Sequence, residues 1–107
     1  MLRRRADFES IGRAGIARST PLIVLRSLRT DRPETRVGLS TPRTIGGAVQ
    51  RNQVRRRLRS LLRERIGRIG PGWDLLLIAR PAAGDASQAE LGAAIDALLA
   101  RSDIGSE

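Results

Sequence analysis

The chain has 107 residues, which suffices for one compact domain and leaves no room for a second large one. All 20 basic residues are arginine, and against 11 acidic residues they give a net charge of +9, which indicates a polyanionic partner. Because histidine and cysteine are absent, the composition excludes a histidine base, a Ser-His-Asp triad, a thiol nucleophile and a zinc ribbon.

The first predicted element is a short helix over residues 2–13, where apolar residues recur at a spacing of three. A strand is predicted at residues 22–25, a consecutive apolar run that includes β-branched residues. The sequence Asp-Arg-Pro at 31–33 predicts a turn, and alternating apolar residues over 37–41 predict another strand. We expect these two strands to pair as an antiparallel hairpin.

The segment 48–68 predicts an amphipathic helix that ends before the Gly-Pro-Gly sequence at 70–72. Its apolar face consists of Val54, Leu58, Leu61, Leu62 and Ile66. Within an arc of about 100° beside that face lie Asn52, Arg55, Arg56, Arg59 and Arg63. A solvated helix normally interleaves acidic and basic residues, whereas Glu64 is the only acidic residue here. The one-sided positive charge therefore predicts a surface that binds nucleic acid.

The last third of the chain predicts a strand and a helix. The continuous apolar run at 74–80 is typical of a strand covered on both faces. Ser87 and Glu90 have the spacing of a capping box, which opens a final helix. The apolar side of that helix consists of Leu91, Ile95, Leu98 and Leu99. This mixture predicts an α+β fold with one sheet, as a single domain over 1–101 followed by a disordered tail at 102–107.

Residues 46–59, GGAVQRNQVRRRLR, closely resemble the signature of the bacterial ribonuclease P protein family. The similarity continues, in the same order, through residues 2–8, 36–40 and 72–80. The resemblance implies an about four-stranded mixed sheet with three helices in the order α-β-β-β-α-β-α. It also implies a left-handed crossover through the basic helix, against the usual hand.

The resemblance implies a function in which the protein assists a catalytic RNA. That RNA removes the 5′ leader of precursor tRNA by hydrolysis that depends on Mg²⁺, and the RNA holds the metal. The expected partners are therefore the ribonuclease P RNA and precursor tRNA, with no small-molecule substrate and no metal site on the protein. The candidate RNA-binding residues are Arg43, Arg51, Asn52, Arg55, Arg56, Arg59 and Arg63. The candidate residues of the cleft for the leader are Phe8, Arg5 and Ile11.

Two departures from the family signature concern the start of the basic helix. Gln53 occupies the position of the second arginine of the R-N-R triplet, and Gly47 replaces an asparagine. Gly12 and Arg26 occupy positions near which the family often places aromatic residues of the cleft. Contacts with the leader are therefore expected to depend more on charge than on stacking.

Other functions stay open on the sequence. A structural RNA-binding protein of ribosomal type would carry a similar arginine face. A protein-only nuclease would need clustered carboxylates, whereas the acidic residues near the N-terminus are scattered. No apolar run approaches the length of a membrane span, and we expect a cytoplasmic protein with no membrane partner.

Overall fold

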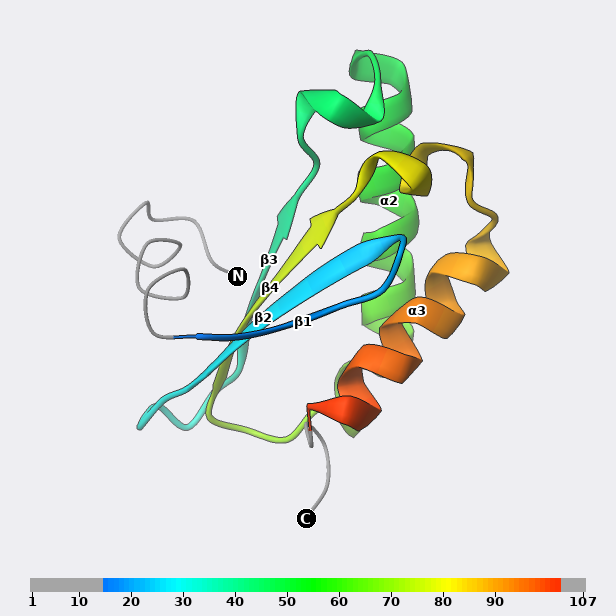
Figure 1. Cartoon of the computed structure of the whole chain (residues 1–107). Coiled ribbons are helices and arrows are strands. Elements are labelled where there is room, and N and C mark those ends of the chain that lie inside the picture. The colour runs from blue at the N-terminus through cyan, green and yellow to red at the C-terminus, as the bar shows by residue number, and fades with distance from the viewer. Residues whose placement is uncertain (1–14, 103–107) are drawn as a thin grey trace.

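The computed structural model describes residues 15–102, which form one four-stranded sheet and two α-helices (Figure 1). The strands are β1 (Ile16–Ser19), β2 (Ile23–Arg29), β3 (Arg36–Ser40) and β4 (Trp73–Ala79), in the spatial order β1-β2-β4-β3. The sheet is mixed, because β4 pairs antiparallel with β2 and parallel with β3. The expected α+β fold is thereby confirmed, and the first predicted helix, over residues 2–13, lies outside the described residues.

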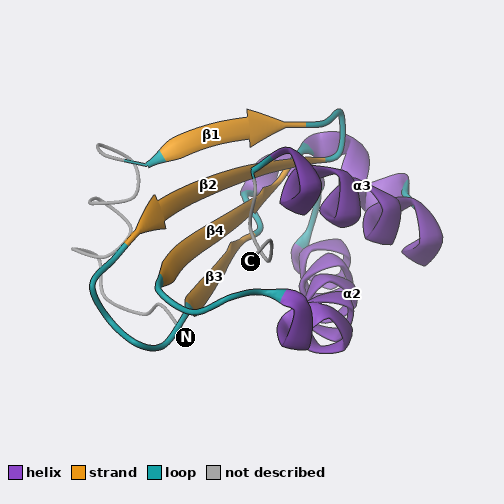
Figure 2. Ribbon diagram, turned by 90° about the horizontal axis from the view of Figure 1, so that it is seen from below, coloured by secondary structure: helices purple, strands orange, loops and turns teal. Residues whose placement is uncertain are grey.

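Both helices lie on the same face of the sheet (Figure 2). Helix α2 (Ala48–Arg65) connects β3 to β4, and α3 (Gln88–Arg101) follows β4. Three short 3-10 turns complete the order, namely η1 (Arg43–Ile45), η2 (Ile66–Arg68) and η3 (Pro81–Asp85). The crossover from β3 through α2 places the arginine-rich helix beside the sheet edge formed by β3.

The predicted hairpin between residues 22–25 and 37–41 is wrong. Strand β4 lies between β2 and β3 and is hydrogen-bonded to both. As the most apolar strand, β4 buries side chains on both faces, so a central place removes the most apolar surface from water. The hairpin partner of β2 is instead β1, a short exposed strand that the residue pattern did not locate.

The core confirms the periodicity of α2 and β4. Val54, Leu58, Leu61 and Leu62 of α2 are buried in one core cluster with Leu75 and Leu77 of β4. On the opposite face of the sheet, Leu76 is buried with Leu28 and Ile78 against it. The prediction that residues 74–80 are covered on both faces is therefore confirmed, over observed bounds of Trp73–Ala79.

The start of α3 agrees with the sequence prediction, whereas the end of α2 differs from it. The capping box of α3 is present, since the Glu90 amide donates to Ser87 Oγ at 3.1 Å and the Ser87 amide donates to Glu90 Oε1 at 2.8 Å. Helix α2 was expected to reach residue 68 with Ile66 in its apolar face, whereas Ile66 is 49% exposed. The chain tightens at that point into the 3-10 turn η2, and Ile66 is left half exposed at the end of the apolar face.

A buried carboxylate fastens the β2–β3 connection to the sheet. Asp74 is 3% exposed and accepts hydrogen bonds from Arg36 Nε at 3.0 Å, Arg36 Nη2 at 2.8 Å and Arg32 Nη2 at 2.5 Å. Burial raises the pKa of Asp74, but the hydrogen bonds from Arg36 and Arg32 outweigh it and the pKa is lowered. Arg32 and Arg36 thus share one carboxylate from the last third of the chain.

Candidate nucleic-acid interface

The connection from β3 into α2 is shaped by two glycines. Gly46 has a φ of +150°, a backbone conformation that residues with a Cβ rarely adopt, and this favours glycine at the position. Gly47 is the N-cap of α2, and the first helical turn contains no acidic residue. The positive end of the helix dipole therefore adds to the positive charge of the arginines that follow.

Two arginines of α2 are held by Thr41, the residue that follows β3. Arg51 Nε donates to the Thr41 carbonyl at 3.2 Å, and Arg55 Nη2 donates to Thr41 Oγ1 at 2.7 Å. Arg55 Nη1 also donates to Asn52 Oδ1 at 3.3 Å. These bonds fix two guanidinium groups without neutralising them, because every acceptor is uncharged. The sequence pattern placed Thr41 only in a strand and gave no sign of this anchoring role.

Three further arginines of α2 are exposed. Within the described residues, Arg56, Arg59 and Arg63 make no hydrogen bond or ion pair with another residue. We call the set of Arg51, Asn52, Arg55, Arg56, Arg59 and Arg63 the arginine face. A hollow of about 470 Å³ on this face is lined by Val49, Asn52, Arg55, Arg56 and Arg59. The structure therefore brings four of the predicted RNA-binding residues around one hollow, with Val49 as an unpredicted apolar member.

The other predicted residues lie apart from this hollow. Arg43 is exposed in η1, before the N-terminus of α2. Arg63 lies farther along α2, beyond Arg59. The predicted cleft residues Phe8, Arg5 and Ile11 lie outside the described residues. Of the predicted tail, Ser102 caps α3 and donates its amide to the Leu98 carbonyl, and the rest lies outside the described part of the chain.

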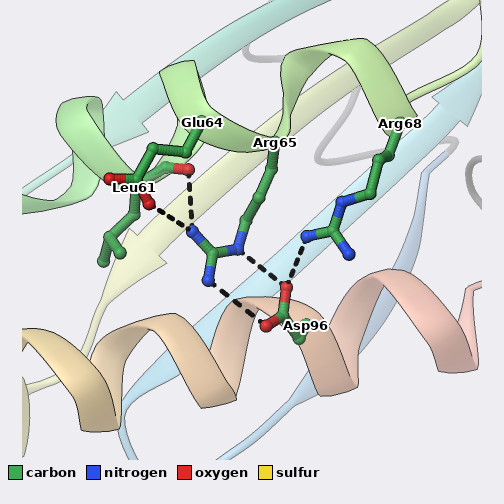
Figure 3. A network of polar contacts seen from close by, with 5 residues as sticks. All are labelled: Leu61, Glu64, Arg65, Arg68 and Asp96. Carbon is green, nitrogen blue, oxygen red and sulfur yellow. Dashed lines mark hydrogen bonds and ion pairs between the residues drawn. The ribbon is translucent and has the colours of Figure 1, made fainter.

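Two arginines of α2 point away from the arginine face. Arg57 Nη1 donates to the Ala86 carbonyl at 3.0 Å, next to η3. Arg65 lies between the two helices, where Nε donates to Asp96 Oδ1 at 2.7 Å and Nη2 donates to Asp96 Oδ2 at 3.2 Å (Figure 3). A carboxylate of α3 therefore compensates the charge of Arg65, which the pattern within the helix does not indicate.

The Asp96 site is a small network. Arg68 Nη2 also donates to Asp96 Oδ1 at 2.9 Å, and Arg65 Nη1 contacts both Glu64 and the Leu61 carbonyl (Figure 3). The hydrogen bond from Arg65 is the main cause that lowers the pKa of Asp96. This network fastens α2 to α3 and neutralises positive charge away from the arginine face.

The described residues show two further properties of the surface. Between residues 15 and 102, no acidic side chains gather into a group of three or more that could hold a metal ion. None of the helices in this range combines the length and the apolar character needed to cross a membrane.

Comparison with known proteins identifies the family to which this chain is similar. The family model described as "Ribonuclease P" matches residues 1–103. The "Ribonuclease P protein component" of Streptomyces avermitilis is 44% identical over 109 aligned positions, which cover 94% of this chain and 89% of the relative. The counterpart of Acidothermus cellulolyticus is 41% identical, with 94% of this chain and 85% of the relative covered.

Solved structures agree with these relatives. The ribonuclease P protein of Thermotoga maritima superposes with a TM-score of 0.84 at 26% identity, covering 94% of each chain. That of Staphylococcus aureus superposes with a TM-score of 0.89 over 98% of this chain and 96% of the other, and at 23% identity it shows the shared fold.

Proposed function

The chain belongs to the ribonuclease P protein family and is a protein subunit of this tRNA-processing endoribonuclease, and we propose that its arginine face binds the RNA subunit. The observation that carries the proposal is the separation of charge on α2. Arg57 and Arg65 are bound to acceptors of the protein, whereas Arg56, Arg59 and Arg63 are exposed without an acceptor among the described residues. Like charges held so close together are stabilised when a polyanion supplies the counter-charge.

The mode of binding follows from how the guanidinium groups are held. Thr41 fixes Arg51 and Arg55 in place, so little side-chain entropy is lost when they meet phosphates. Arg56 and Arg59 extend the same surface around the hollow. A guanidinium group can contact a phosphate with two parallel hydrogen bonds, which suits this surface to an RNA backbone.

We propose that the phosphodiester chemistry resides in the RNA subunit and that the RNA holds the Mg²⁺. The chain has neither histidine nor cysteine, and two of its described acids, Asp74 and Asp96, are paired with arginines. The donor set of residues 15–102 does not fit a protein-held metal site. In this proposal the protein lowers the electrostatic cost of bringing two polyanions together.

The remaining family features stay part of the proposal. We propose that Phe8, Arg5 and Ile11 contact the precursor leader and that Arg43 extends the RNA contact. We also propose that the β3–α2–β4 crossover is left-handed and that the protein acts in the cytoplasm, as a single domain over residues 1–101.

A reconstitution experiment tests the proposed function. A transcript of the Streptomyces avermitilis ribonuclease P RNA is incubated with precursor tRNA at low millimolar Mg²⁺, with and without this protein, and the protein is also tested alone. We expect the protein to raise leader cleavage by the RNA and to cleave nothing by itself. A folded protein that leaves the rate unchanged would contradict the proposal, and cleavage by the protein alone would move the chemistry to the chain.

A structural RNA-binding protein of ribosomal type is the alternative that the arginine face alone would allow. Sequencing the RNA that copurifies with the protein separates the two functions. We expect ribonuclease P RNA to be enriched over ribosomal RNA, and the reverse enrichment would favour the alternative.

A further inference from the structure

A second hollow, of about 300 Å³, lies between α2 and the edge strand β3. Its lining residues are Val37 of β3, Arg59, Leu62 and Arg63 of α2, and Ile66 of η2. Nearly all of its wall is apolar, although Arg59 and Arg63 are among the residues that line it. Val37 and Leu62 are buried, whereas Ile66 is 49% exposed, so one large apolar side chain stands open to solvent here.

The chemistry of this apolar hollow restricts what fits into it. Its wall offers aliphatic carbon, and among residues 15–102 no acidic side chain lines it, while Arg59 and Arg63 supply positive charge. A matching group is apolar over a flat surface and negatively charged at its ends. An unpaired nucleotide has both properties, because its base has apolar faces and its phosphates carry charge.

The apolar hollow is continuous with the arginine face. Arg59 lines both this hollow and the larger one that contains Asn52, Arg55 and Arg56. An RNA strand whose phosphates follow the arginine face would therefore pass the mouth of the apolar hollow. Paired bases are stacked inside a duplex, so only an unpaired base could turn into the hollow.

We propose that the apolar hollow receives one unpaired base of the RNA subunit, with Arg59 and Arg63 on the adjoining phosphates. The proposal rests on the proposed function, since it requires that α2 faces RNA. It adds a contact with a base to a surface that otherwise binds the backbone. The base contributes affinity through apolar contact with Val37, Leu62 and Ile66, which does not depend on salt.

The test compares two isoleucines that are exposed to a similar degree. Ile66→Gln changes the hollow, and Ile16→Gln is the matched control on β1, where Ile16 is 59% exposed. Binding to the ribonuclease P RNA transcript is measured over a series of salt concentrations. We expect Ile66→Gln to bind about fivefold more weakly, which corresponds to burying the exposed half of an isoleucine. The salt slope should stay unchanged, and Ile66→Leu should restore the affinity.

The results separate this inference from the proposed function. If the wild type does not bind the RNA, both fail. If the wild type binds and Ile66→Gln binds as well as Ile16→Gln, the base-binding inference alone is overturned. A lowered salt slope for Ile66→Gln would also overturn it, because the lost contact would then be ionic.

Crosslinking gives a second readout that does not depend on affinity. A benzophenone side chain is placed at position 66, and the crosslinked nucleotide is mapped by primer extension on the RNA. We expect crosslinks at one unpaired nucleotide. Crosslinks spread over duplex segments, or to a second copy of the protein, would contradict the inference.

Discussion

Replacing Arg56 by glutamine removes one exposed charge from the arginine face, and the next residue supplies a matched control. Arg57→Gln makes the same chemical change about 100° around the helix, where the guanidinium donates to the Ala86 carbonyl at 3.0 Å. The two variants have the same net charge and nearly the same position in the sequence. They differ in whether the lost charge faces the proposed RNA or the protein.

The magnitude follows from counterion release. Each phosphate contact contributes about 0.7–0.9 to the slope of log affinity against log salt. The five arginines of the arginine face then give a slope of about −4. Arg56→Gln is expected to reduce the magnitude of this slope by about one unit. Between 50 and 200 mM salt, the affinity of the variant should fall about threefold less than that of the wild type.

Arg57→Gln is expected to leave the salt slope unchanged and to lower stability instead. The lost hydrogen bond to Ala86 is worth about 1 kcal/mol, which lowers the Tm by about 5 °C in a domain of this size. The assay is filter binding of the ribonuclease P RNA at several salt concentrations, with thermal unfolding of each variant. Equal slopes for both variants and the wild type would refute the assignment of the RNA contact to this face. An equal loss in both would show that only net charge matters.

Two predictions concern the folded state. Asp74→Asn removes the buried carboxylate charge that pairs with Arg36 and Arg32, and it should lower the free energy of unfolding by about 2 kcal/mol, measured in urea. The loss is moderated because Arg32, at 41% exposure, can be solvated by water, and a loss below about 0.5 kcal/mol would contradict this role. Because folding lowers the pKa values of Asp74, Asp96 and Glu90, their stabilisation is complete above about pH 5 and is lost progressively as the pH falls below it. Unfolding measured from pH 6 to pH 2 should show this decline, and an unchanged stability would refute it.

Helix α2 was predictable because the residue spacing that defines it lies within one short stretch of the sequence. The spacing of Val54, Leu58 and Leu61 defines the buried face from the sequence alone, and the neighbouring arc of arginines follows from the same period. The same arc leaves Arg57 on the far side, which the structure confirms. Ile66 broke the pattern because the last turn changes from α to 3-10 geometry.

The strand pairing was not predictable in the same way. The strands predicted at 22–25 and 37–41 exist, over observed bounds of Ile23–Arg29 and Arg36–Ser40. Their shared partner is β4, which begins more than thirty residues beyond β3 in the chain. Pairing across such a distance depends on burial in the whole sheet, which a local alternation pattern does not contain. The neutralisation of Arg65 by Asp96 was missed for the same reason, since the acid is on another helix.

Asp74 and Asp96 pair with arginines that lie away from the arginine face. The uncompensated positive charge of α2 is therefore concentrated on one side of the molecule. A polyanion that comes within a Debye length, about 8 Å at physiological ionic strength, meets uncompensated charge on one side and ion pairs on others. The resulting torque turns the protein before contact, so that a larger share of diffusional encounters begins in the productive orientation. The acids therefore act on the rate of association, although they need not touch the partner.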